Sequence, residues 1–168
     1  VVPQILMPHE VQDMLAINSD QNVAWQRGLH MASTSESVLL SWSDLLDDVK
    51  TRLAALLNVD AGQIDDLRME RHLEGQFTFR QRPAEGLEYC VAIYLNDGGA
   101  KSLKDDPNGV QDVPFTDFLL GESEPLLRIE ALSGAAVIWK AGDENIERIE
   151  PICERPKYQL TCIVRRCH

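Results

Sequence analysis

The chain has 168 residues, is 44% hydrophobic and 26% charged, and carries a formal net charge of −11, which fits one globular domain over 1–168. The acidic charge argues against a nucleic-acid partner held through phosphate contacts. No run of 18 apolar residues is present, so the sequence predicts neither a membrane span nor a membrane partner.

The N-terminal part, about 1–65, is predicted to be helical. Segment 7–17 (MPHEVQDMLAI) has the spacing of a short helix, and segment 43–59 (SDLLDDVKTRLAALLNV) that of a stronger one. Ser43 can cap the second helix, and acidic residues fill its first turn. Its apolar stripe consists of Leu45, Leu46, Val49, Leu53, Leu56 and Leu57.

From about 66 to 168 the sequence predicts short strands separated by turns. The clearest is 88–95, in which Tyr89, Val91, Ile93 and Leu95 point one way and Cys90, Ala92 and Tyr94 point the other. The other predicted strands are 67–73, 76–80, 126–132, 134–141 and 158–166, and 101–114 is a predicted loop. Helices followed by many short strands indicate an α+β fold, with a sandwich or barrel packed against the helices.

Four segments in order resemble the prolyl 4-hydroxylase-like branch of the Fe(II)/2-oxoglutarate dioxygenases. They are GQFTFRQRP (75–83), AIYLNDGG (92–99), LSGAAVIWKA (132–141) and IERIEPICERPKYQLTCIVRR (146–166). The resemblance covers most of the chain and is strongest from Arg71 to Arg166. It implies a double-stranded β-helix (jelly roll) with flanking N-terminal helices.

The same resemblance implies where iron ligands belong. Ferrous iron that activates O₂ is held by two His and one carboxylate on one face, so that the other positions stay open. The family carries His-x-Asp where this chain has Gln81, Arg82 and Pro83, and a second His where it has Glu147. Pro83 offers no side-chain ligand, and an arginine repels a cation. The resemblance therefore predicts three degenerate metal positions, Gln81, Pro83 and Glu147, and no metal or other cofactor.

The basic residue with which the family grips the distal carboxylate of 2-oxoglutarate is matched. Lys157 stands ten residues after Glu147, and Tyr94 matches the family's tyrosine. These two residues are candidates for binding 2-oxoglutarate or a similar anion. The alternative is a structural lysine whose stem packs in the barrel and whose ammonium meets a nearby glutamate.

Other cation sites are weaker in the sequence. His72 and Glu74 have the spacing of half a facial triad but come one strand too early, which favours a structural or surface role for His72. Glu144, Glu147 and Glu150 could bind a hard cation such as Ca²⁺, although solvated acids are more common.

Two functions follow from these residues. The first is an oxygenase-fold domain that has lost iron binding and catalysis and acts as a protein-binding or assembly module in a larger complex. The alternative is an active Fe(II)/2-oxoglutarate-dependent hydroxylase acting on a protein or peptide. No signal peptide is visible, but the first residue is Val1, so the compartment stays open, as does pairing among the four cysteines.

Overall fold

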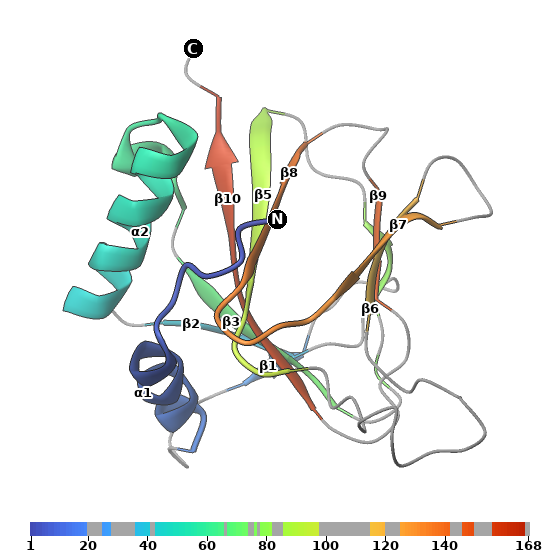
Figure 1. The fold of residues 1–168 in the computed structure, drawn as a ribbon, viewed down its shortest axis with the longest axis horizontal. Coiled ribbons are helices and arrows are strands. Elements are labelled where there is room, and N and C mark those ends of the chain that lie inside the picture. Colours follow the sequence, from blue (N-terminus) through green and yellow to red (C-terminus); the bar gives the residue numbers. More distant parts are fainter. Residues whose placement is uncertain are drawn as a thin grey trace.

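The computed structural model describes residues 1–19, 25–27, 36–40, 43–65, 67–73, 76, 78–81, 86–97, 115–119, 125–141, 146–149 and 156–166. The strands of these residues form two antiparallel sheets with helices on one side (Figure 1). The six-stranded sheet has the order β1 (Gln26–Arg27), β2 (Glu36–Leu39), β3 (Arg68–His72), β10 (Lys157–Arg165), β5 (Leu87–Tyr94), β8 (Ala136–Lys140). The four-stranded sheet has the order β4 (Thr78–Gln81), β9 (Ile146–Ile149), β6 (Phe115–Leu119), β7 (Pro125–Glu130).

The helices α1 (Pro8–Ser19) and α2 (Asp44–Leu57) lie where the sequence predicts them, and a short 3-10 helix, η1 (Ala61–Gln63), follows. Ser43 caps α2, because its hydroxyl accepts a hydrogen bond from the backbone N–H of Leu46 at 3.3 Å. The predicted apolar stripe is wrong at Leu56, which is 50% exposed because it lies past the edge of the face that packs on the sheet. No helix among the described residues is long and apolar enough to cross a membrane.

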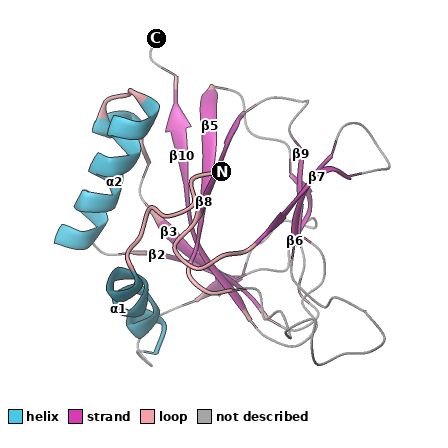
Figure 2. Ribbon diagram, viewed as in Figure 1, coloured by secondary structure: helices cyan, strands magenta, loops and turns pink. Residues whose placement is uncertain are grey.

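The six-stranded sheet is covered on both faces, by the helices on one and by the small sheet on the other. One face packs against the helices through residues such as Met69, Ile93 and Leu160, together with Val49 and Leu53 of α2. The other face looks toward the four-stranded sheet, where Tyr94 and Val137 cluster with Ile129 of β7. Figure 2 shows these layers in the order helices, large sheet, small sheet. We call the face of the large sheet that looks toward the small sheet the inner face.

Two strands that the sequence analysis did not anticipate lie inside region 1–65, and two lie beyond it. β1 and β2 extend the large sheet where only helices were expected, and β6 and β9 form the middle of the small sheet. Each of the four spans two to five residues, which is too short for an alternating pattern to stand out. The predicted loop 101–114 lies outside the described residues.

An ion pair joins the two helices. Arg52 of α2 donates from Nη1 to Oε2 of Glu10 at 2.9 Å and pairs through Nη2 with Oε1. Arg52 also donates to the backbone carbonyl of Ile5 at 2.9 Å. The hydrogen bond from Arg52 is the largest cause that lowers the pKa of Glu10 from 4.5 to about 2, although burial acts in the opposite direction.

We expect this pair to make stability depend on pH. The folded pKa of Glu10 lies below its unfolded value, so its contribution is complete above pH 4.5 and is lost as pH falls toward 2. Because Arg52 is partly exposed, we expect a contribution on the order of 2 kcal/mol. Urea unfolding at pH 7 and pH 3 should show a smaller pH effect for Glu10→Gln than for wild type. Asp13→Asn, on the same helix, serves as the control.

Candidate functional site

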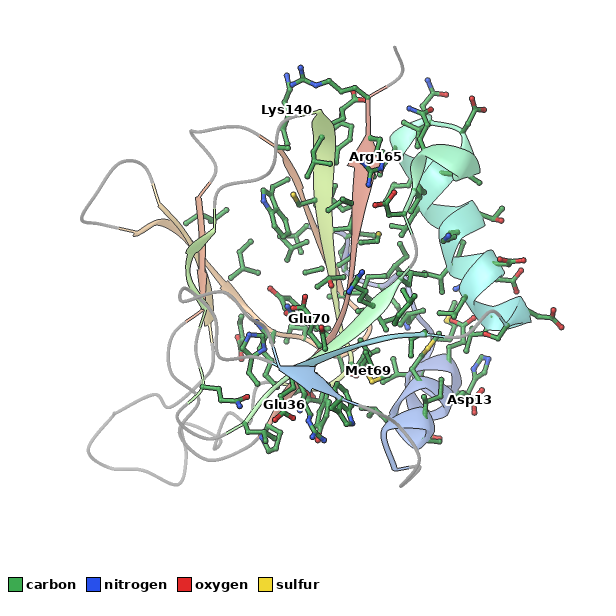
Figure 3. All side chains as sticks on the ribbon, turned by 180° about the vertical axis from the view of Figure 1, so that it is seen from behind. Asp13, Glu36, Met69, Glu70, Lys140 and Arg165 are labelled. Atoms are coloured by element: carbon green, nitrogen blue, oxygen red, sulfur yellow. The ribbon has the colours of Figure 1, made fainter. Side chains whose placement is uncertain are left out.

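The closing strand β10 carries the candidate anion-binding lysine on the inner face. Leu160, Cys162 and Val164 belong to the core under the helices, so the alternate residues Lys157, Gln159 and Thr161 point the other way. Registers agree with this, because Gln159 stands opposite Tyr94 of β5 and opposite Glu70 of β3. Figure 3 labels Glu70 and its neighbour Met69 on opposite sides of β3.

Lys157 and Tyr94, the two candidates for anion binding, meet in the interior. Lys157 is fully buried, Tyr94 is 1% exposed, and the Lys157 ammonium lies 4.8 Å from the centroid of the Tyr94 ring. At this distance the ring face attracts the cation. The predicted carboxylate within salt-bridge reach of Lys157 stays a prediction.

The backbone around Lys157 is held by the asparagine of the Tyr-Leu-Asn segment. The side-chain amide of Asn96 donates to the carbonyl of Pro156 at 2.7 Å and accepts from the N–H of Tyr158 at 2.8 Å. Both partners are immediate neighbours of Lys157. Asn96 thus fixes the chain at the start of β10 and sets the direction in which the lysine side chain leaves the strand.

His72 lies beside Lys157 on the inner face. The two residues stand opposite each other in the β3–β10 pairing, and both are fully buried. Burial is the main cause that lowers the pKa of His72 from 6.5 to about 3, and the positive charge of Lys157 adds to it. His72 is therefore neutral at physiological pH.

A short hydrogen-bonded chain continues the polar surface along β10. Gln159, 2% exposed, donates from Nε2 to Oε2 of Glu70 at 3.1 Å, and the hydroxyl of Thr161 donates to Oε1 of Glu70 at 3.0 Å. The inner face of the large sheet therefore carries five polar or aromatic residues: Glu70, His72, Tyr94, Lys157 and Gln159.

Two of the three positions where the resemblance implies metal ligands lie on the opposite sheet. Gln81 is the last residue of β4, Glu147 lies in β9, and the antiparallel register places them directly opposite each other. Directly paired positions have Cβ atoms about 5 Å apart. Two sites where the resemblance implies metal ligands are therefore brought together by the fold, while Arg82 and Pro83 lie outside the described residues.

The sequence also suggested two other cation sites, one at His72 and Glu74 and one at Glu144, Glu147 and Glu150. Within the described residues, no group of three or more His, Cys, Asp or Glu side chains is placed to hold a metal ion. His72 is buried on β3 rather than β4, and Glu74, Glu144 and Glu150 lie outside the described residues. Cys162 is a free thiol, while Cys153 and Cys167 are outside the described part.

Solved structures share this architecture over nearly the whole chain. The viral collagen prolyl hydroxylase from Paramecium Bursaria Chlorella virus-1, in its 2OG complex, is 12% identical with a TM-score of 0.71, covering 99% of this chain and 94% of that one. A prolyl-4-hydroxylase from Pseudomonas putida is 14% identical with a TM-score of 0.66, covering 98% and 90%. The non-heme alpha ketoglutarate dependent epimerase SnoN from nogalamycin biosynthesis is 15% identical with a TM-score of 0.70, covering 98% and 76%. No protein-family model and no curated protein matches the sequence.

The fold is therefore that of the Fe(II)/2-oxoglutarate oxygenases, an α+β jelly roll with flanking helices. Within that class it is similar to the prolyl hydroxylase-like branch, as the four segments predicted. At these identities the similarity establishes the fold.

The residues fit the two family cofactors unequally. Iron needs two imidazoles and a carboxylate, and the paired positions on β4 and β9 hold Gln81 and Glu147. A neutral amide and one carboxylate do not supply that donor set. A carboxylate anion, in contrast, is matched by the buried ammonium of Lys157 beside Tyr94.

Glu70 was missed by the sequence analysis. The segment LRMERHL contains polar residues on both faces of β3, with Arg71 on the side of Met69. Arg71 is accommodated there by an ion pair with Glu36 and by stacking on Trp25, at 4.1 Å from the ring centroid. Alternation alone therefore gave no signal for the inner position of Glu70.

Proposed function

We propose that this chain is a prolyl hydroxylase-like domain that has lost iron binding and catalysis and acts as a protein-binding or assembly module in a larger complex. The observation that carries the proposal is the direct pairing of Gln81 with Glu147 in the small sheet. The resemblance assigns both positions to the metal, and neither of these two paired residues is a histidine. A site of this composition does not offset the cost of removing water from Fe²⁺.

The purified protein is expected to bind no stoichiometric iron and to form no succinate from 2-oxoglutarate. Anaerobic Fe(II) titration followed by calorimetry, and a succinate assay in air, measure the two properties. The informative comparison is the triple variant Gln81→His, Pro83→Asp, Glu147→His, which restores the three family ligands. We expect this variant, checked for folding by its melting curve, to gain a one-to-one iron site.

Two outcomes contradict the proposal in different ways. A one-to-one Fe(II) site of micromolar affinity in the wild-type protein contradicts the loss of metal binding. A folded triple variant that binds no iron contradicts the assignment of these three positions.

The second candidate is an active Fe(II)/2-oxoglutarate-dependent hydroxylase acting on a protein or peptide. The buried Lys157–Tyr94 contact favours it, because an anion-binding lysine is what such an enzyme uses for its cosubstrate. Iron-dependent formation of succinate by the wild-type protein would support the active hydroxylase over the non-catalytic domain.

Binding of a small carboxylate is the part of the ancestral chemistry that we propose is kept. Lys157 supplies the charge, Tyr94 covers it, and neutral His72 adds no competing cation. A protein partner is proposed on the ground that a non-catalytic domain acts through binding. Stoichiometric co-purification of one protein with the tagged chain tests this part.

A further inference from the structure

Gln159 carries a polar atom that the described residues leave without a hydrogen bond. Its side chain is 2% exposed, and its Oε1 has no donor in that part of the chain. Buried amide oxygens are nearly always paired with protein, water or ligand, because an unpaired one costs folding free energy. The atom therefore indicates a donor that comes from outside the strand pair.

The contacts with Glu70 determine which atom of the Gln159 side-chain amide is the nitrogen and which is the oxygen. Its carboxylate accepts hydrogen bonds from Gln159 Nε2 at 3.1 Å and from the Thr161 hydroxyl at 3.0 Å. An ionised carboxylate only accepts, so the NH₂ group of Gln159 must face Glu70. The amide oxygen Oε1 of Gln159 therefore points away from Glu70, in a fixed position where it can accept a hydrogen bond.

The position of this acceptor relates it to the anion-binding lysine. Gln159 and Lys157 lie two residues apart on the same face of β10, about 7 Å along the strand. Tyr94 stands opposite Gln159 in the register and contacts the Lys157 ammonium. One small molecule can thus meet the ammonium with a carboxylate and Gln159 with another group.

We infer that Gln159 determines ligand specificity at this site, so that the preferred ligand is a small carboxylate bearing a hydroxyl or ammonium donor rather than a keto acid. This inference rests on the proposed retention of carboxylate binding. A keto oxygen and Gln159 Oε1 are both acceptors and repel each other, whereas a hydroxyl or ammonium N–H donates to Oε1. No metal at Gln81 and Glu147 is needed to orient such a ligand.

The test compares four five-carbon dicarboxylates that differ at one carbon: glutarate, 2-oxoglutarate, 2-hydroxyglutarate (both enantiomers) and glutamate. Calorimetry with the full chain measures their affinities for wild type, Gln159→Met and Lys157→Met. We expect wild type to bind one 2-hydroxyglutarate enantiomer or glutamate about tenfold more tightly than 2-oxoglutarate, the size of one hydrogen bond to a neutral acceptor. In Gln159→Met, which keeps the length of the side chain, the preference should fall to about twofold or less.

The outcomes separate the inference from the proposed function. Equal affinities for all four acids in wild type, weakened together by Lys157→Met, keep the carboxylate site and overturn the role of Gln159, leaving an ordered water as its partner. A preference that persists in folded Gln159→Met overturns the role as well. Binding of none of the acids overturns both the inference and the proposed carboxylate site.

Discussion

We expect millimolar 2-oxoglutarate to stabilise the wild-type protein through the proposed carboxylate site, and we expect replacement of Lys157 by methionine to abolish this stabilisation. Methionine keeps the apolar stem of the buried side chain and removes only its charge. Truncating one partner of a buried charge pair costs about 2–5 kcal/mol, so the affinity for a carboxylate should fall by at least about thirtyfold. Ligand-induced stabilisation scales with concentration over Kd and should disappear at the same ligand concentration.

Thermal melts with and without ligand measure this effect. Lys140→Met is the matched control, because Lys140 ends β8 as an exposed residue and the substitution is chemically the same. If the ammonium instead pairs with an internal carboxylate, Lys157→Met should melt lower than wild type even without ligand, since that acid is left unpaired. Identical melts of wild type and Lys157→Met, in all conditions, would contradict both roles for the buried lysine.

The pKa of His72 gives an independent measure of the positive charge on Lys157. Its folded pKa, about 3, lies below the ordinary 6.5, so the native state loses stability as pH falls from 6.5 toward 3, where unfolded His72 is protonated. In Lys157→Met the pKa of His72 should rise, because a neighbouring positive charge is gone. It should stay well below 6.5, since burial is the larger cause. NMR titration of the imidazole can follow this change, which a surface lysine does not produce.

The inner position of Lys157 could be predicted because the closing strand has a decisive pattern. Leu160, Cys162 and Val164 make one face apolar enough to fix the register of the strand against the helices. Ser43 and the stripe of α2 were similarly readable, since cap and periodicity are local. In these elements one short stretch of sequence contains the whole signal.

The pairing of Gln81 with Glu147 could be suggested only by resemblance. β4 and β9 have four residues each, and their register is set by strands far apart in the sequence. Glu70 shows the same limit at the level of side chains. Glu70 can face inward because its neighbour Arg71 pairs with Glu36 and stacks on Trp25 on the other face of the strand. Both partners of Arg71 lie far from it in the sequence.

Gly134→Ala is expected to destabilise the protein by about 3 kcal/mol or more. Gly134 has φ +82, which costs a residue with a Cβ about 1–2 kcal/mol. An added Cβ also meets the carbonyl oxygen of Leu6 at 2.6 Å, and that contact is with backbone. The backbone is tied there, because the carbonyl of Gly134 accepts from the N–H groups of Ile5 at 2.8 Å and Leu6 at 3.2 Å.

Gly86→Ala separates strain from contact. Gly86 has φ +85, yet an added Cβ has nothing within 4 Å. It should therefore show the conformational cost alone, about 1–2 kcal/mol, and the difference between the two variants measures the clash with Leu6. Because the Gly134 N–H also donates to the carbonyl of Tyr94 at 2.8 Å, relief of the clash should shift the end of β5. Urea unfolding gives the two energies, and equal destabilisation by both substitutions would contradict the close approach of the N-terminal segment to β8. Weaker carboxylate binding by folded Gly134→Ala, with Gly86→Ala unchanged, is then expected from the displaced Tyr94 ring.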